Sequence, residues 1–292
     1  MTPERSNSNA TTFAWPPRGP MAPDVELHSA SEQGDTKSHN RGIHLSRLRA
    51  AMTDLESFWL APTHIPIAQR MREGHWQADS CDAYCDRCGA SIGPFEASEF
   101  GCADCDETRP PWSRFVRLGA YDNELSEWIT DLKFAGRRDA GAAIGRALGA
   151  AIRNAGCPLE NTVIVPVSMP ALRKLARPID HANEIAHHVA ATLRAPKVIA
   201  FKRSLRPPQR SASATERRRN VRGSFRPRRG VDFSDWRVVV VDDVKTTGAT
   251  LHEACRVLRR MGAREIWACV AAVTPSPRRR ESEGNSGHAA RG

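Results

Sequence analysis

The chain has 292 residues, of which 40% are hydrophobic and 26% are charged, and its formal net charge at pH 7 is +10. The mean hydropathy is −0.49, and the sequence contains neither an apolar run long enough for a membrane span nor the apolar segment of a secretory signal. We therefore expect a cytoplasmic protein, whose eight cysteines serve a purpose other than disulfide formation.

The N-terminal part of the chain is expected to hold little tertiary structure. Residues 1–42 are rich in Ser, Asn, Pro and Gly and are predicted to be a disordered tail. Residues 43–75 are predicted to form an amphipathic helix and a linker, with the helix ended by Pro62 and Pro66. Its apolar face packs on the same chain or on a partner, with a membrane surface as the less favoured alternative. The face consists of Leu45, Leu48, Met52, Leu55 and Trp59.

The next segment, 76–110, contains two Cys-x-x-Cys pairs. Cys85 and Cys88 form the first pair, and Cys102 and Cys105 form the second after thirteen intervening residues. This spacing is typical of a zinc ribbon, in which four thiolates surround one Zn²⁺ ion. The intervening segment has too few apolar residues to build a core, so a metal would stabilise it.

Two alternatives remain open for these cysteines. Cys81 precedes the first pair and could replace Cys85 as a ligand, and the thiols could instead be reduced or redox-active. A site closed by four cysteines leaves no position for a substrate, which favours a structural zinc over a catalytic one. The other cysteines lie in apolar patterns and are expected to be buried core thiols. They are Cys157, Cys255 and Cys269.

Residues 111–274 alternate between helical and extended patterns, which predicts a parallel sheet flanked by helices with right-handed crossovers. The predicted helices have their apolar faces at Leu125, Trp128, Ile129 and Leu132, at Ile144, Leu148 and Ile152, and at Ile185, Val189 and Leu193. The predicted strands cover 162–169, 197–201, 238–241 and 265–274. The polar residues 275–292 are predicted to be a second disordered tail.

Most of the positive charge lies in one segment of this region. Residues 203–229 contain ten arginines and one acid, Glu216, so they carry nearly the whole net charge of the chain. We expect a flexible basic loop, which could bind phosphate groups or single-stranded nucleic acid.

Directly after this loop, residues 238–250 read VVVVDDVKTTGAT. The four valines predict a strand buried on both faces, and a helix follows, with its apolar face at Leu251, Ala254, Leu258 and Met261. A buried strand that ends in a polar turn would explain the valines but not two adjacent, mutually repelling acids. Asp242 and Asp243 at the carboxyl end of a strand, followed by a hydroxyl-rich loop at a helix N-terminus, predict a sugar-phosphate site. The acids would bind ribose hydroxyls or Mg²⁺.

This stretch resembles the phosphoribosyl-pyrophosphate (PRPP) signature of type I phosphoribosyltransferases. The resemblance implies that Asp242 and Asp243 are catalytic and that the loop binds PRPP. Lys245 stands where an apolar residue is usual, and its side chain could either add charge near a phosphate or point to solvent. The loop residues are Thr246, Thr247, Gly248, Ala249 and Thr250.

The whole arrangement resembles the ComF family, which joins a four-cysteine ribbon to a type I phosphoribosyltransferase domain. The matching elements are LKF at 132–134, VPVSMPALRKLARPIDHANEIA at 165–186 and LRPPQRSASATERRRNVRGSF at 205–225. The resemblance implies a pyrophosphate-binding loop at Val167 and Ser168, and a closing lid in which Arg217 contacts PRPP. Pro178 and residues 179–181 depart from the family pattern. His181 is the one candidate general base, and a structural role for it is favoured.

The predicted fold is therefore α/β, of the type I phosphoribosyltransferase class, preceded by a small zinc ribbon. The resemblance implies binding of PRPP with Mg²⁺, phosphoribosyl transfer to an unknown acceptor, and a role in DNA uptake or utilisation beside other DNA-uptake proteins. Two alternatives remain. The chain could bind single-stranded DNA through 203–229 as a non-catalytic competence factor, or it could be a PRPP-responsive regulator.

Overall fold

The computed structural model describes residues 65–93, 96, 101–103, 105, 109–167, 169, 179–203 and 221–275. The two predicted tails, the helix expected before Pro62 and most of the arginine-rich loop lie outside these residues. None of the described helices combines the length and the apolar character that a bilayer crossing requires.

The described chain alternates between helices and strands, as its periodicity predicts. The helices are α2 (Ile67–Glu73), α3 (Asn123–Thr130), the π-helical turn η1 (Asp131–Ala135), α4 (Arg138–Asn154), α6 (His181–Leu193) and α8 (Ala249–Arg260). The strands are β1 (Arg114–Ala120), β2 (Thr162–Pro166), β3 (Phe201–Arg203), β4 (Phe225–Pro227), β5 (Arg237–Lys245) and β6 (Glu265–Val273).

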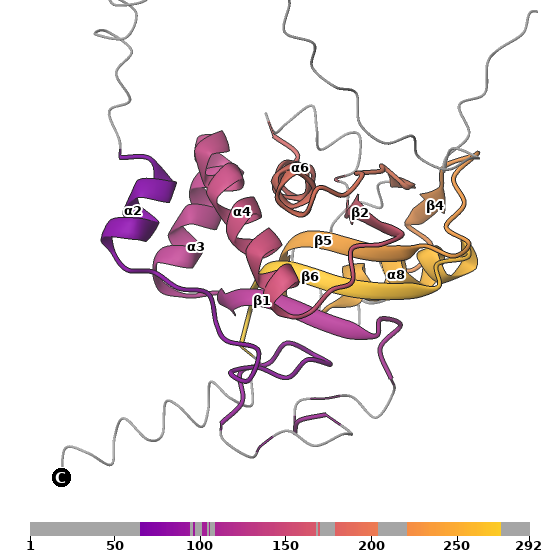
Figure 1. Cartoon of the computed structure of the whole chain (residues 1–292), viewed down its shortest axis with the longest axis horizontal. Helices are drawn as coiled ribbons and strands as arrows, with labels where there is room; N and C mark the ends of the chain where they lie inside the picture. The colour runs from indigo at the N-terminus through magenta and orange to yellow at the C-terminus, as the bar shows by residue number, and fades with distance from the viewer. Residues whose placement is uncertain are drawn as a thin grey trace, which may run out of the picture.

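A four-stranded parallel sheet in the order β1-β6-β5-β2 forms the centre of the fold. Val238 to Val241 of β5 are fully buried because helices cover both faces of the sheet. Val239 and Val241 pack in the core under α3, α4 and α6, whereas Val238 and Val240 pack under α8. Figure 1 shows these two helical layers on either side of the sheet. The predicted α/β class with a parallel sheet is confirmed.

One local expectation differs from the structure, and one strand was not predicted. Residues 197–201 do not form a strand of the parallel sheet: Lys197 makes a single bridge to Ile164, and β3 begins only at Phe201 and pairs antiparallel with β4. Pro66 stands at the N-cap of α2, and the helix that it was expected to end lies outside the described residues. The sequence pattern also missed β1, because the buried Arg117 interrupts its apolar run.

Helices α4 and α6 approach each other closely through glycines of α4. A Cβ atom at Gly145 would lie 2.6 Å from the carbonyl oxygen of Ile185 and 2.6 Å from the Cβ of His188.

We expect Gly145→Val to lower the free energy of unfolding by about 3 kcal/mol, because α6 would have to move away from its core positions. Urea unfolding measures this loss. Ala150→Val, at an exposed position of the same helix, should change the stability little, and equal losses in both variants would contradict the packing argument.

Candidate functional site

The acid pair lies within the last residues of β5. Asp242 pairs in register with Val270 of β6, and the pairing continues to Lys245, so both acids are held by the sheet rather than by a loose turn. Only three residues separate β5 from α8. Gly248, the last of them, has a φ of 73°, in the region that favours glycine. The loop is thus a tight turn that directs the backbone N–H groups of the α8 N-terminus toward this edge of the sheet.

Asp243 is held by side chains from two other elements. Lys133 of η1 places its Nζ 3.0 Å from the Asp243 Oδ2 atom, and His181 at the start of α6 places its Nδ1 3.5 Å from the same oxygen. The Val244 N–H donates to the Asp243 Oδ1 atom at 2.6 Å. Burial acts to raise the pKa of Asp243, but the His181 hydrogen bond and the Lys133 charge outweigh it and lower the pKa. Asp243 is therefore an anchored carboxylate.

Asp242 has a different environment. Burial, followed by the negative charge of Asp243, raises the pKa of Asp242 to about 8. The Asp243 N–H donates to the Asp242 Oδ1 atom at 2.9 Å, which acts in the opposite direction. Because one acid is charged and the other is largely neutral near pH 7, the pair avoids the repulsion that two adjacent carboxylates would suffer. A cation at this edge would favour ionisation of Asp242.

Lys133 is a site residue to which the sequence analysis assigned no role. It lies in η1, a π-helical turn that ends at Gly136 with a φ of 68°, and such turns are frequent at functional sites. Leu132 is fully buried beside it, whereas Lys133 reaches Asp243. The LKF element at 132–134 was the signal for this lysine, although the sequence did not show that its partner is Asp243.

The structure shows where the side chains of His181 and Lys245 lie. His181 is 3% exposed, and within the described part of the chain its Nε2 atom has no hydrogen-bond partner. The favoured structural role therefore takes the form of a contact with Asp243. The Lys245 Nζ atom lies 5.9 Å from the centre of the Phe115 ring, and the side chain lines a cavity together with Thr247. Lys245 therefore faces this cavity beside the loop.

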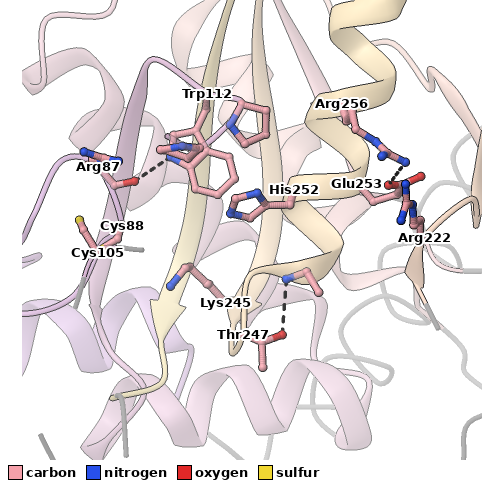
Figure 2. A pocket seen from close by; sticks show the side chains of 13 residues that line it. Arg87, Cys88, Cys105, Trp112, Arg222, Lys245, Thr247, His252, Glu253 and Arg256 are labelled. Carbon is pink, nitrogen blue, oxygen red and sulfur yellow. Dashed lines mark hydrogen bonds and ion pairs between the residues drawn. The ribbon is translucent and has the colours of Figure 1, made fainter. Parts of the chain in front are cut away.

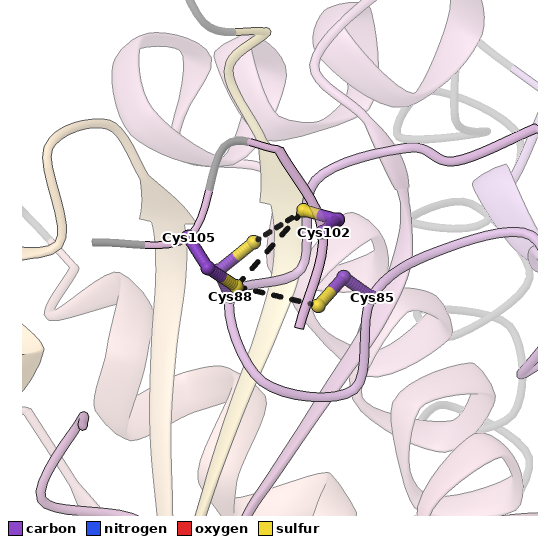
Figure 3. Close-up of side chains that lie close together, drawn as sticks. All are labelled: Cys85, Cys88, Cys102 and Cys105. Carbon is purple, nitrogen blue, oxygen red and sulfur yellow. Dashed lines mark hydrogen bonds between the residues drawn. The ribbon is translucent and has the colours of Figure 1, made fainter. Parts of the chain in front are cut away.

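The four cysteines of the two pairs converge on one point (Figure 3). Their sulfur atoms all lie within 4.8 Å of one another. The Cys85–Cys105 and Cys88–Cys102 sulfur distances are 3.6 and 3.5 Å. A tetrahedron with Zn–S bonds of about 2.3 Å requires sulfur atoms about 3.8 Å apart, so the four thiols are spaced to hold a metal ion. Cys81 lies outside this group and is exposed.

The turn between the first two cysteines has the geometry of a metal-binding knuckle. The Gly89 N–H donates to the Cys85 carbonyl at 2.7 Å, and the Ala90 N–H points at the Cys88 sulfur at 3.4 Å. Gly89 has a φ of 76°, and a Cβ atom there would lie 2.3 Å from the Phe115 ring. Glycine is therefore required at this position both by the backbone conformation and by the close contact with β1.

The cysteine ribbon is fixed to the sheet by residues in and before β1. Arg117 donates to the Gly89 carbonyl at 2.8 Å and forms an ion pair with Asp79 at 2.6 Å. The Trp112 indole N–H donates to the Arg87 carbonyl at 2.8 Å. These bonds explain why an arginine occupies the interior of β1 and how the ribbon is held against β1 and the segment before it.

With this geometry established, comparisons with known proteins assign the family. A model of the phosphoribosyl transferase domain matches residues 139–286, just over half of the chain. The chain belongs to this phosphoribosyl transferase family. Competence protein F of Haemophilus influenzae is 29% identical over 189 residues, which cover 63% of this chain and 81% of that protein. DNA utilization protein YhgH of Salmonella typhi is 30% identical over 196 residues, which cover 63% and 82%. The resemblance to the ComF family is confirmed.

The remaining residues that the family resemblance implied are only partly described. Val167, which follows β2 of the phosphoribosyltransferase domain, is buried, and its N–H donates to the Val241 carbonyl at 2.8 Å. The backbone after β2 is therefore tied to the strand that carries the acids. Ser168 and Arg217 lie outside the described residues, as does the stretch 170–178.

Proposed function

We propose that this phosphoribosyltransferase domain binds PRPP together with Mg²⁺ at the carboxyl end of β5. The observation that carries the proposal is the pair Asp242 and Asp243, which is held in β5 two residues before the Thr246–Thr250 loop at the N-terminus of α8. The loop N–H groups and hydroxyls suit the 5′-phosphate, and the acids suit ribose hydroxyls or Mg²⁺, which prefers carboxylate oxygen. Val167 and Ser168 would face the pyrophosphate.

The proposed reaction is transfer of the phosphoribosyl group to an acceptor. The bond between ribose C1 and the pyrophosphate oxygen breaks, its electron pair leaves with pyrophosphate, and an acceptor lone pair forms the new bond to C1. Because the sugar becomes cationic in this step, positioning and negative charge account for most of the catalysis. Asp243 supplies that fixed charge, and Lys133 and His181 keep its carboxylate in one orientation. Arg217 would contact the phosphates.

Calorimetric titration with PRPP, with and without Mg²⁺, tests this proposal directly. We expect binding that depends on Mg²⁺, followed by pyrophosphate release when the correct nucleobase or other acceptor is supplied. Binding without turnover on every acceptor would support the alternative of a PRPP-responsive regulator. The absence of PRPP binding under both conditions would contradict the proposal.

The biological setting that we propose is DNA uptake or utilisation. It is supported by the names of the relatives, a competence protein and DNA utilization proteins. Single-stranded DNA and other proteins of the same process are the proposed partners. We place the protein in the cytoplasm, because a reducing compartment keeps the four clustered thiols available for a structural Zn²⁺ ion.

Replacing arginines in the loop 203–229 tests whether this loop is a PRPP lid or a DNA-binding segment. We expect that Arg217→Gln with Arg218→Gln and Arg219→Gln weakens PRPP binding, because a lid delivers guanidinium groups to the phosphates. Titration calorimetry measures this loss. If the loop binds single-stranded DNA instead, the same variant lowers the salt dependence of DNA affinity by about 0.7 in slope for each lost phosphate contact, and PRPP binding stays unchanged.

A further inference from the structure

A cavity of about 550 Å³ lies between the cysteine ribbon and α8, and neither acid of the pair lines it. Figure 2 shows side chains from the ribbon, from the segment before β1 and from α8 around it. Its volume falls in the range of small-molecule sites. Thr247 and Ala249 form one end, so the cavity begins at the phosphate loop. The full lining is Arg87, Cys88, Cys105, Pro110, Pro111, Trp112, Arg222, Lys245, Thr247, Ala249, His252, Glu253 and Arg256.

Basic side chains outnumber acidic ones among the described residues that line the cavity. Four are basic, Arg87, Arg222, Lys245 and Arg256, and Glu253 is the one carboxylate among these described residues. This carboxylate is already engaged: it accepts from the Gly223 N–H at 2.8 Å and pairs with Arg256 at 2.8 Å. The residues around the cavity therefore carry an excess of positive charge that an anionic ligand would neutralise.

One wall of the same cavity is aromatic and apolar. The exposed His252 ring meets Trp112 edge to face, with ring centres 4.6 Å apart and an interplanar angle of 66°. The indole is fixed beneath it by the hydrogen bond to Arg87, and Pro110 and Pro111 extend the wall. The exposed His252 ring, held against the buried Trp112, lies beside Arg222 and Arg256 (Figure 2), and this pairing of an aromatic ring with guanidinium groups matches a ligand with a planar base at one end and a phosphate at the other.

We propose that this cavity binds a nucleotide unit, with its base against His252, Trp112 and the two prolines and its phosphate on Arg256 and Arg222 (Figure 2). The unit comes either from a free mononucleotide or from a single strand of nucleic acid, because both present the same base and phosphate. The acid pair does not line this cavity, which meets the proposed PRPP site only at the loop residues Thr247 and Ala249. The cavity also assigns a role to the ribbon, which forms one wall.

Binding of dAMP and of a 5′-phosphorylated dodecamer of deoxyadenylate to the full chain tests the proposal. Arg256→Gln and His252→Ala should each weaken binding of the occupying probe about tenfold. Arg260→Gln is the matched control, because Arg260 is exposed on the same helix but does not line the cavity. It removes the same charge and should change the affinity less than twofold.

The two probes identify the source of the nucleotide. Tighter binding of the dodecamer, with both probes weakened by Arg256→Gln, assigns the cavity to a strand. Binding of dAMP alone assigns it to a mononucleotide. If the variant Asp242→Asn with Asp243→Asn still binds dAMP or the dodecamer, this site is distinct from the proposed PRPP site. The two proposals can then fail independently of each other. Binding of neither probe, insensitivity of both probes to Arg256→Gln and His252→Ala, or an equal loss in Arg260→Gln would overturn the proposal.

Discussion

Replacing Asp242 and Asp243 together by asparagine is expected to abolish Mg²⁺-dependent PRPP binding. Asparagine has nearly the same shape and still hydrogen-bonds a hydroxyl, but it supplies no negative charge to a cation. Each hydrogen bond to a charged group contributes about 1.5 to 3 kcal/mol, so losing two such groups should weaken PRPP binding by a hundredfold or more. Titration calorimetry at saturating Mg²⁺ measures the change.

Two controls accompany this double variant. Asp122→Asn with Glu124→Gln removes two exposed carboxylates that are distant in sequence from the acid pair. This variant loses the same net charge and should leave PRPP binding unchanged, which would exclude a general effect of net charge. Circular dichroism and thermal melting should show a retained fold, although Lys133 and His181 lose their ionised partner. Unchanged PRPP affinity in a folded double variant would mean that the acids do not bind the ligand.

Replacing Cys88 or Cys105 by serine is expected to remove the metal from the ribbon. The wild-type chain should purify with about one Zn²⁺ ion, and a site with three thiolates no longer completes the tetrahedron. Metal binding in small ribbons provides most of their folding free energy, so residues 81–105 should become sensitive to protease. Atomic emission measures the metal, and limited proteolysis measures the local unfolding.

Cys81→Ser is the matched control for the cysteine variants. Its thiol is exposed and lies outside the cluster, so the variant should retain its metal and its resistance to protease. Full metal retention in both Cys88→Ser and Cys105→Ser would contradict the proposed ligand set. Loss of metal in Cys81→Ser alone would show that Cys81 takes the place of Cys85.

Some features of the site could be predicted because they depend on short stretches of chain. The run Val238–Val241 predicted a buried parallel strand, since four β-branched residues in succession suit a strand covered on both faces. The pairs Cys85/Cys88 and Cys102/Cys105 predicted a four-sulfur cluster because the spacing within each pair fits one tight turn. The Thr246–Thr250 stretch predicted a tight turn before a helix, and α8 begins within this stretch at Ala249.

Other features were decided only by the tertiary structure. Lys133 and His181 meet at Asp243 although they lie far apart in the sequence, and this contact follows from the order in which η1, α6 and β5 pack. Local periodicity carries no information on such partners. Arg117 gave β1 the appearance of a polar segment in the sequence. Its burial is possible because Asp79 neutralises its charge, and the sequence did not show this ion pair. Lys197–Phe201 resembled a sheet strand, yet β2 bonds this segment only around Lys197.

The sequence by itself determined the α/β class, the four-cysteine cluster and the position of the acid pair, because strand and helix periods and turn spacings are local properties of the chain. Only the tertiary structure decided which groups surround those elements. It placed Lys133 against Asp243, and it set the ribbon beside α8 so that Arg87 and Arg256 line one cavity with Trp112 and His252. The physical reason is that the side chains lining a site are brought together by the packing of whole elements, whereas each element forms from its own residues.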